Sequence, residues 1–183
     1  MASGGGRSPS VPGEAVSLPE RILLVPEKLV FDCRSGGRLV LTPSVLMVMQ
    51  GYRQIGSEDL EAGGVLMGRI ENNGWTTVIE RLTTPKPQDF RHRFAFHMID
   101  PEHDAELKHV FETTNGEVFC AGHWHTHPED FPNPGPEDVE SWRGTLAESK
   151  PGNPCFFAIV GRIEVGVWEG DAATGEIRKM QPR

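Results

Sequence analysis

Three histidines alternate within the segment Gly-His-Trp-His-Thr-His-Pro, where they are His123, His125 and His127. Side chains at positions i and i+2 of a β-strand point to the same face, with Cα atoms about 6.5–7 Å apart. Two imidazoles at that spacing can converge on one metal ion. All three cannot easily share it, because a strand from His123 to His127 spans about 13 Å. We therefore predict that His125 and His127 bind a metal and that His123, one step further back, does not.

A third ligand must come from a separate element, and Asp138 is the best candidate. It follows His127 by eleven positions and lies in the first turn of a helix predicted from Pro136. The helix dipole favours a carboxylate at that place. Two histidines and one carboxylate leave the fourth position of tetrahedral Zn²⁺ open to a water molecule. Such a water becomes a nucleophile near neutral pH.

That water needs a base that does not itself bind the metal, and we assign this role to Glu61. The residue precedes the apolar run Ala-Gly-Gly-Val-Leu-Met-Gly at 62–68, which predicts a buried strand with Glu61 at its mouth. A carboxylate there can accept a proton and pass it to a leaving amine. The chain has no H-E-x-x-H, P-loop, G-x-G-x-x-G or G-x-S-x-G motif, which excludes the helical zincin pattern and the common nucleotide-binding and serine-hydrolase patterns.

Strands and turns around these residues follow from apolar periodicity and from glycine, proline and asparagine signals. The sequence Asn72-Asn73-Gly74 predicts a tight hairpin turn. Residues 85–93 are polar and are expected to form a loop. The predicted strands cover 21–25, 29–32, 38–41, 63–71, 75–83, 94–97, 117–127, 155–162, 163–169 and 176–180.

Three helices are predicted from their capping signals. Thr42, followed by proline, begins a helix over 43–54. Asp100, also followed by proline, begins a second helix that ends before Gly116. The third covers 136–148. Strands mixed with three helices indicate an α+β or three-layer protein with a mixed sheet.

The composition limits the partners. The 183 residues fit one compact domain, and a hydrophobic fraction of 37% is enough for a core. A net charge of -8 argues against a nucleic-acid partner, because phosphate binding needs a basic surface. No apolar run is long enough to cross a bilayer, so no membrane partner is expected. Residues 1–17 are expected to form a disordered tail without a signal peptide, and 18–183 the folded domain.

Three cysteines occur, at 33, 120 and 155, without a C-x-x-C pair. Reduced thiols in the cytoplasm are the simplest interpretation. Cys120 and Cys155 lie in apolar runs and are expected in the core. His103 and His109 lie six residues apart on the second predicted helix, so they do not share a face and are expected at the surface.

The combination of Glu61 with Gly-Gly-Val-Leu-Met-Gly, His-Thr-His-Pro at 125–128 and Asp138 resembles the JAMM (MPN-plus, Mov34/PAD-1) metalloproteases. The similarity covers roughly residues 38–168. The motif Trp-His-Thr-His-Pro-Glu, with Trp142 four residues after Asp138, resembles the bacterial branch of this family. That branch accompanies ubiquitin-like conjugation modules in antiphage (CBASS) and Bil-type operons.

This resemblance implies the three-layer α/β/α, cytidine-deaminase-like MPN fold with one Zn²⁺. It implies an isopeptidase or peptidase that cleaves after the C-terminal glycine of a ubiquitin-like protein. In that family the metal would be bound by the residues that match His125, His127 and Asp138, and Glu61 would be the general base. The partners are then the ubiquitin-like protein, its conjugates and the activating or conjugating enzymes of the same operon. Phe94 and Phe96 are expected to flank the groove for the substrate tail.

One position departs from the family motif. The family motif has a serine that donates a hydrogen bond to the oxyanion, and this sequence has Gly135 at the matching position. Losing one such donor typically costs roughly 10²–10³ in rate. A backbone N–H, a water, the zinc, Ser141 or His123 are candidate substitutes. Two alternatives therefore stay open: a catalytically weak MPN module that binds or scaffolds a ubiquitin-like partner, and a peptidase that processes sulfur carriers.

Two tryptophans and one basic loop are assigned by their neighbours. Trp124 alternates with the histidines, so it is expected in the core on the opposite face. Trp142 shares a helix face with Asp138 and is expected to support the site by packing. The basic loop with Lys86, Arg91, His92 and Arg93 is expected either to contact a partner or the substrate tail, or to be an ordinary solvated loop.

Overall fold

The computed structural model describes Met1 and residues 27–71 and 74–183. The expected tail over 1–17, the expected strand over 21–25 and the turn residues Asn72 and Asn73 lie outside the described residues. Within the described ranges, no helix is both long and apolar enough to cross a membrane.

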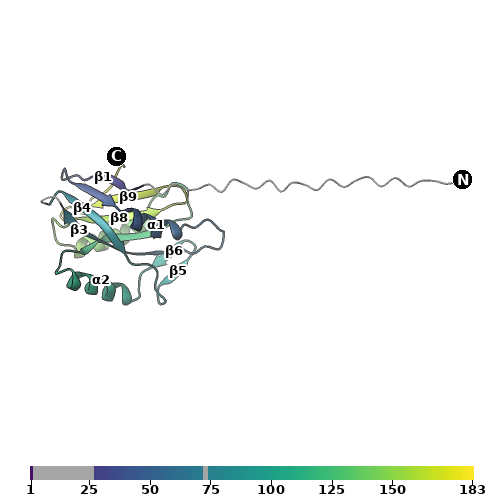
Figure 1. Ribbon diagram of the computed structural model, residues 1–183, viewed down its shortest axis with the longest axis horizontal. Helices are drawn as coiled ribbons and strands as arrows, with labels where there is room; N and C mark the ends of the chain where they lie inside the picture. The colour runs from purple at the N-terminus through teal and green to yellow at the C-terminus, as the bar shows by residue number, and fades with distance from the viewer. Residues whose placement is uncertain (2–26, 72–73) are drawn as a thin grey trace.

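The described chain forms one large mixed sheet, a small second sheet and three helices (Figure 1). In the large sheet the strand order is β1-β2-β4-β3-β7-β8-β9-β10. The β2–β4 and β7–β8 pairs are parallel, and the other pairs are antiparallel. The elements are β1 (Leu29–Asp32), β2 (Arg38–Leu41), α1 (Pro43–Gly51), β3 (Gly63–Glu71), β4 (Thr76–Leu82), β5 (Phe90–His92), β6 (Ala95–His97), α2 (Glu102–Thr113), β7 (Phe119–Thr126), α3 (Pro136–Glu148), β8 (Cys155–Val160), β9 (Val165–Gly170) and β10 (Ile177–Lys179).

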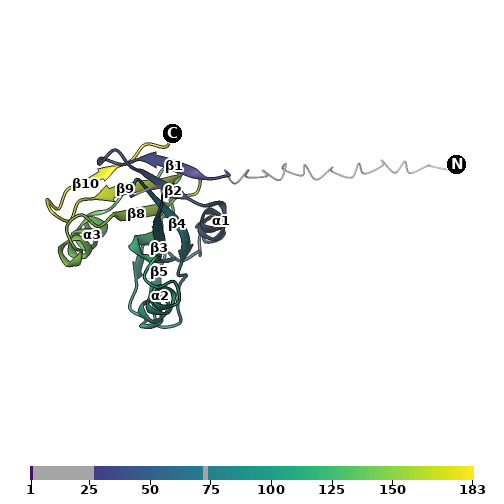
Figure 2. The same cartoon turned by 60° about the vertical axis from the view of Figure 1, so that its left-hand side comes forward.

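The helices cover both faces of the sheet, which confirms the α+β fold with a mixed sheet between helices. On one face, the buried side chains of α1 join a core cluster with Phe156, Ala158 and Val160 of β8. On the other face, Trp142 and Leu146 of α3 pack with the alternate residues of the same strand. Helix α2 covers β3 on that second side through Val110. Figure 2 shows α1 and α3 on opposite sides of the sheet.

The sheet curls until its two ends approach each other. Phe31 of β1 forms an antiparallel bridge with Pro182, which follows β10. The backbone N–H of Arg183 donates to the Val30 carbonyl at 2.9 Å, and that of Arg34 donates to the Glu169 carboxylate at 3.0 Å. The C-terminal residues therefore satisfy backbone groups that the edge strand β1 would otherwise expose.

A bulge in β7 sets the direction of the histidines. Leu66 pairs with Gly122 but Met67 pairs with Cys120, so Ala121 is the extra residue on β7. Gly122 has φ of 130°, and a Cβ there would lie 1.8 Å from the Phe156 carbonyl oxygen, so only glycine fits. Bulges of this kind change which face the following side chains occupy.

The structure corrects several expectations. Residues 85–93 are not all loop, because β5 lies within them and pairs with β6. The first helix ends at Gly51 rather than at 54, because Gln54 turns inward and its amide donates to the Asp59 and Arg93 carbonyls. Cys120 of β7 is exposed and not in the core, whereas Cys155 is buried as expected. The three cysteines are free thiols.

Candidate metal centre

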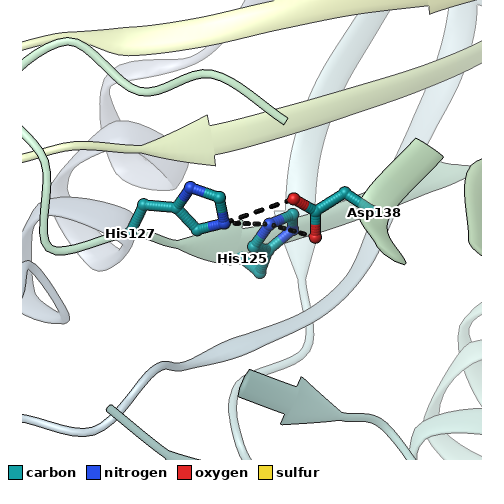
Figure 3. Close-up of side chains that lie close together, drawn as sticks. All are labelled: His125, His127 and Asp138. Atoms are coloured by element: carbon teal, nitrogen blue, oxygen red, sulfur yellow. Dashed lines mark hydrogen bonds and ion pairs between the residues drawn. The ribbon is translucent and has the colours of Figure 1, made fainter. Parts of the chain in front are cut away.

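The end of β7 brings two imidazoles together. His125 and His127 point to the same side, and their Nε2 atoms lie 3.1 Å apart (Figure 3). Both side chains are mostly buried, each with 12% of its surface exposed. His123 occupies the same face of β7 but belongs to no group of metal-ligating side chains among the described residues. That His123 does not bind the metal therefore stays a prediction.

Asp138 reaches the same point from the start of α3. Its Oδ1 lies 3.1 Å from His125 Nε2, and its Oδ2 lies 3.4 Å from His127 Nε2. Gly135 is the N-cap residue of this helix, and its backbone N–H donates to Asp138 Oδ2 at 2.6 Å. Helix capping therefore fixes the carboxylate that faces the histidines.

The three side chains have the donor types and the spacing of a zinc site. Zinc bonds of about 2.0–2.1 Å at tetrahedral angles place neighbouring ligand atoms roughly 3.3 Å apart. The distances between the facing atoms, 3.1 Å, 3.1 Å and 3.4 Å, are close to that value. His125, His127 and Asp138 thus form a group that can hold a metal ion.

Electrostatics within the group follow from burial and from the mutual contacts. Burial alone would raise the pKa of Asp138, but hydrogen bonds with the two histidines bring it far below its usual range. Burial lowers the pKa of His125. Burial also opposes the charged form of His127, but the contact with Asp138 outweighs it and raises the pKa of His127. An ionised aspartate beside imidazoles is the donor set that divalent zinc prefers.

Glu61 lies next to this group, just before β3. Its Oε1 is 3.9 Å from His127 Nε2, and the residue is only 5% exposed. Burial raises the pKa of Glu61 to about 8; the charge of His127 opposes this effect, and the charges of Asp138 and Glu129 add to it. A carboxyl group with that pKa can gain and lose a proton near neutral pH.

The backbone of Glu61 is held by β5, which the sequence had indicated as loop. Its N–H donates to the His92 carbonyl at 2.9 Å, and its carbonyl accepts from Arg91 Nε at 2.7 Å. Arg93 donates to the Gly56 carbonyl at 2.7 Å, and Lys86 pairs with a carboxylate of α2. The basic loop is therefore neither free in solvent nor fully available to a partner, because three of its cations bind this chain.

Aromatic packing supports the histidines from both faces of the sheet. Trp142 is 3% exposed and stacks on Phe157, with ring centroids 4.6 Å apart. Its ring centroid lies 6.3 Å from that of His125. Trp124 is 1% exposed and belongs to the cluster on the α1 side. Both tryptophans therefore lie where the sequence predicts them.

A cavity of about 840 Å³ surrounds the candidate centre. Phe94 and Phe96 line it on the β6 side, and His123, Gly135 and Ser141 line it on the α3 side. Burial lowers the pKa of His123 to about 4, so its imidazole is neutral at physiological pH. A Cβ added at Gly135 would meet only Asp138 Oδ2, at an ordinary 3.4 Å, so a serine fits at this position.

Sequence reasoning missed one group of polar residues beside the site. His103 is 1% exposed and not at the surface, whereas His109 is exposed as expected. His103 contacts Thr83 and Asp89. The sequence carries a signal for the burial of His103, because His103, Leu107 and Val110 share one face of α2 at helical spacing.

Comparisons with known proteins show what this chain is similar to. Residues 53–174 match the family model described as prokaryotic homologs of the JAB domain. A "CD-NTase/cGAS isopeptidase" of Escherichia coli (strain TW11681) is 31% identical over 156 residues, covering 85% of this chain and 96% of the relative. A protein of the same name from Pseudomonas aeruginosa (strain BWHPSA011 / Pa011) is 34% identical, covering 68% of this chain and 77% of the relative. Another from Vibrio cholerae serotype O1 (strain ATCC 39315 / El Tor Inaba N16961) is 32% identical, covering 74% of this chain and 83% of the relative. The solution structure of a Desulfitobacterium hafniense protein has a TM-score of 0.50 at 21% identity, covering 76% of this chain and 87% of that one, which concerns the fold alone.

Proposed function

The chain belongs to the family of prokaryotic homologs of the JAB domain, and we propose that it is a zinc-dependent isopeptidase of a bacterial antiphage system. The bond that it hydrolyses follows the C-terminal glycine of a ubiquitin-like protein, either in a conjugate or in a precursor. The name shared by the three relatives supports a CD-NTase as the conjugated target. The enzymes that form the conjugate are the expected functional partners.

One observation carries the proposal: two imidazole nitrogens and the carboxylate oxygens of one aspartate face one another at 3.1–3.4 Å, with a buried carboxyl group beside them. His125, His127 and Asp138 would hold the ion. When bound there, Zn²⁺ supplies a Lewis acid that acidifies water and polarises a carbonyl oxygen.

Glu61 moves the proton in this proposal. Its carboxylate accepts a proton from the attacking water, and the resulting acid donates that proton to the departing amine. The residue is close enough to the ligands to exchange a proton with a water molecule held there. The hydrogen bonds between β5 and its backbone fix the position from which the side chain extends.

An extended substrate tail fits along β6. Within the described residues, β6 pairs only with β5, so its second edge offers free backbone N–H and C=O groups. Such an edge can add one extended peptide by main-chain hydrogen bonds. Phe94 and Phe96 line the cavity on this side. A side chain at Gly63 is excluded, because its Cβ would lie 2.6 Å from the Phe96 ring.

Gly135 favours the second candidate function, a weak or inactive module that binds a ubiquitin-like protein. It offers no hydroxyl to an oxyanion at the place where the family motif has serine. The full set of ligands and the buried Glu61 support the active enzyme instead, because a pure binding module does not need them.

The test uses a ubiquitin-like protein fused or conjugated to a CD-NTase. Wild-type protein is expected to release the two parts, to lose activity with a chelator and to regain it with added Zn²⁺. His125→Ala should lose bound zinc by elemental analysis and should lose cleavage. His109→Ala, in an exposed residue of α2, is the matched control and should keep both. Full zinc content in His125→Ala would remove His125 from the proposed centre.

A further inference from the structure

A second polar cluster is buried beside the substrate edge and takes no part in the chemistry proposed above. Thr83, His103 and Asp89 form a chain in which Thr83 Oγ1 lies 2.6 Å from His103 Nδ1 and His103 Nε2 lies 2.8 Å from Asp89 Oδ2. Thr83 and His103 are each 1% exposed, and the Asp89 side chain is 0% exposed. The order of groups resembles a hydrolytic triad, but no substrate can reach a hydroxyl at that depth.

Both ends of this hydrogen-bonded cluster are anchored. The backbone N–H of Val65 donates to Thr83 Oγ1 at 2.8 Å, and Thr83 Oγ1 in turn shares a hydrogen with His103 Nδ1. His103 Nε2 lies within hydrogen-bond distance of the Asp89 carboxylate. Each member of the cluster therefore has a hydrogen-bond partner, which is the condition under which a buried polar network stabilises a structure.

Asp89 closes the base of the β5–β6 hairpin. It immediately precedes β5, and its Oδ1 accepts the backbone N–H groups of Ile99 and Asp100, which follow β6, at 3.0 and 3.1 Å. Its Oδ2 also accepts the N–H of Lys86 at 2.7 Å. One carboxylate therefore ties both ends of the hairpin together.

Thr83 connects this group of hydrogen-bonded side chains to the two strands of the metal centre. Its N–H donates to the Val65 carbonyl of β3 at 3.0 Å. Its carbonyl accepts the indole N–H of Trp124 at 2.9 Å, and Trp124 is the neighbour of His125 on β7. A rigid connection thus runs from the proposed substrate edge to the strands that carry Glu61 and the histidines.

We propose that Thr83, His103 and Asp89 are positioning residues that hold the β6 edge at a fixed place relative to the metal centre. A substrate tail then binds along β6 more tightly, because the edge is already held in its binding position and need not be ordered when the tail arrives. This inference rests on the proposed function, since it assigns the path of the substrate tail.

The kinetic test compares Thr83→Val, which keeps the shape but removes the hydroxyl, with Thr83→Ser, which keeps the hydroxyl. Two substrates are used: a complete ubiquitin-like fusion, and a short peptide with only the last two tail residues before the cleaved bond. For the fusion, Thr83→Val should raise KM about tenfold, the effect of one lost hydrogen bond, with kcat and zinc content nearly unchanged. The short peptide does not reach along β6, so its kcat/KM should stay the same, and Thr83→Ser should restore the wild-type KM.

Equal losses on both substrates would show a general structural defect and would overturn the inference, as would an unchanged KM for the fusion. Should Thr83→Val not fold, Asp89→Asn provides the second variant. It keeps an amide oxygen for Ile99 and Asp100 but removes an acceptor from His103.

A second measurement does not depend on activity. In the zinc-loaded full chain, amide hydrogen exchange over residues 89–100 should be faster in Thr83→Val than in wild type and in Thr83→Ser, whereas exchange in β8 should not change. If wild type cleaves no ubiquitin-like substrate, the proposed function fails, and the exchange data alone decide whether the cluster holds the hairpin. Unchanged exchange in Thr83→Val overturns the inference whatever the activity.

Discussion

The hydroxyl of Thr126 accepts a hydrogen bond of 3.0 Å from the backbone N–H of Ala62. Thr126 stands between the two candidate histidine ligands in sequence, and Ala62 follows Glu61. The Thr126 N–H also donates to the Ala62 carbonyl at 2.8 Å, and its hydroxyl donates to the Gln54 amide oxygen at 3.0 Å. Two of these buried hydrogen bonds join the ligand strand to the residue that follows the proposed base, and the third ties the same hydroxyl to Gln54.

Thr126→Val should therefore separate metal binding from turnover. We expect zinc content to stay stoichiometric, because neither histidine changes, and kcat to fall about tenfold or more, because Ala62 and Gln54 lose a buried partner and Glu61 shifts. Thr126→Ser is the control and should remain near wild type. Elemental analysis and steady-state kinetics on a ubiquitin-like fusion provide the measurements. An unaltered kcat in the valine variant would show that this link does not position Glu61.

Glu61→Gln should keep the metal and lose the reaction. Glutamine retains the shape but cannot accept a proton, and general-base contributions are typically 10²–10⁴-fold. We expect kcat to fall by that order while zinc content stays at the wild-type level. Glu58→Gln, in an exposed residue of the preceding loop, is the matched control. Turnover at the wild-type rate in Glu61→Gln would exclude Glu61 as the base.

Gly135→Ser tests the departure from the family motif. The site has room for the side chain, since an added Cβ makes only an ordinary contact with Asp138. If an oxyanion donor is missing, the serine should raise kcat, with an upper limit of roughly 10²–10³-fold. Gly135→Ala controls for the backbone change and should not raise it. An unchanged or lower rate in the serine variant would show that another group already stabilises the oxyanion.

Stability at low pH should depend on Asp89. Burial alone would raise its pKa, but hydrogen bonds from His103 and from the backbone N–H groups of Lys86 and Asp100 lower it below the usual value. A carboxyl group whose pKa is lower in the folded than in the unfolded state stabilises the fold above its unfolded pKa of about 3.9. That contribution disappears as the pH falls through the lower, folded-state pKa.

Urea unfolding at several pH values measures this effect. We expect Asp89→Asn to be about 2–3 kcal/mol less stable than wild type at pH 7, because a buried charged acceptor is lost. The difference should shrink as the pH decreases below about 4. Asp32→Asn, in an exposed residue, should show no such convergence. A difference between Asp89→Asn and wild type that is independent of pH would contradict the assignment of an ionised, buried Asp89.

The sequence patterns predicted most of the elements because these patterns are local. A continuous apolar run predicts β8, and proline after Thr42 predicts the start of α1; both elements occur in the structure. The expected capping by Thr42 is only partly found, because its side chain makes no cap hydrogen bond and instead contacts Ser44. Strand β5 was missed because its polar residues become strand only by pairing with β6.

The sequence by itself determined which residue types lie at which spacing: two histidines on one face of a strand, an aspartate in the first turn of a helix and a glutamate before a buried strand. Only the tertiary structure decided that these side chains meet within 3.1–3.9 Å, because the elements that carry them are far apart along the chain. It also decided that His103 is buried and that Arg91 binds the backbone of Glu61. Local sterics set the periodicity of a strand or a helix, whereas burial and hydrogen-bond partners depend on the packing of distant segments.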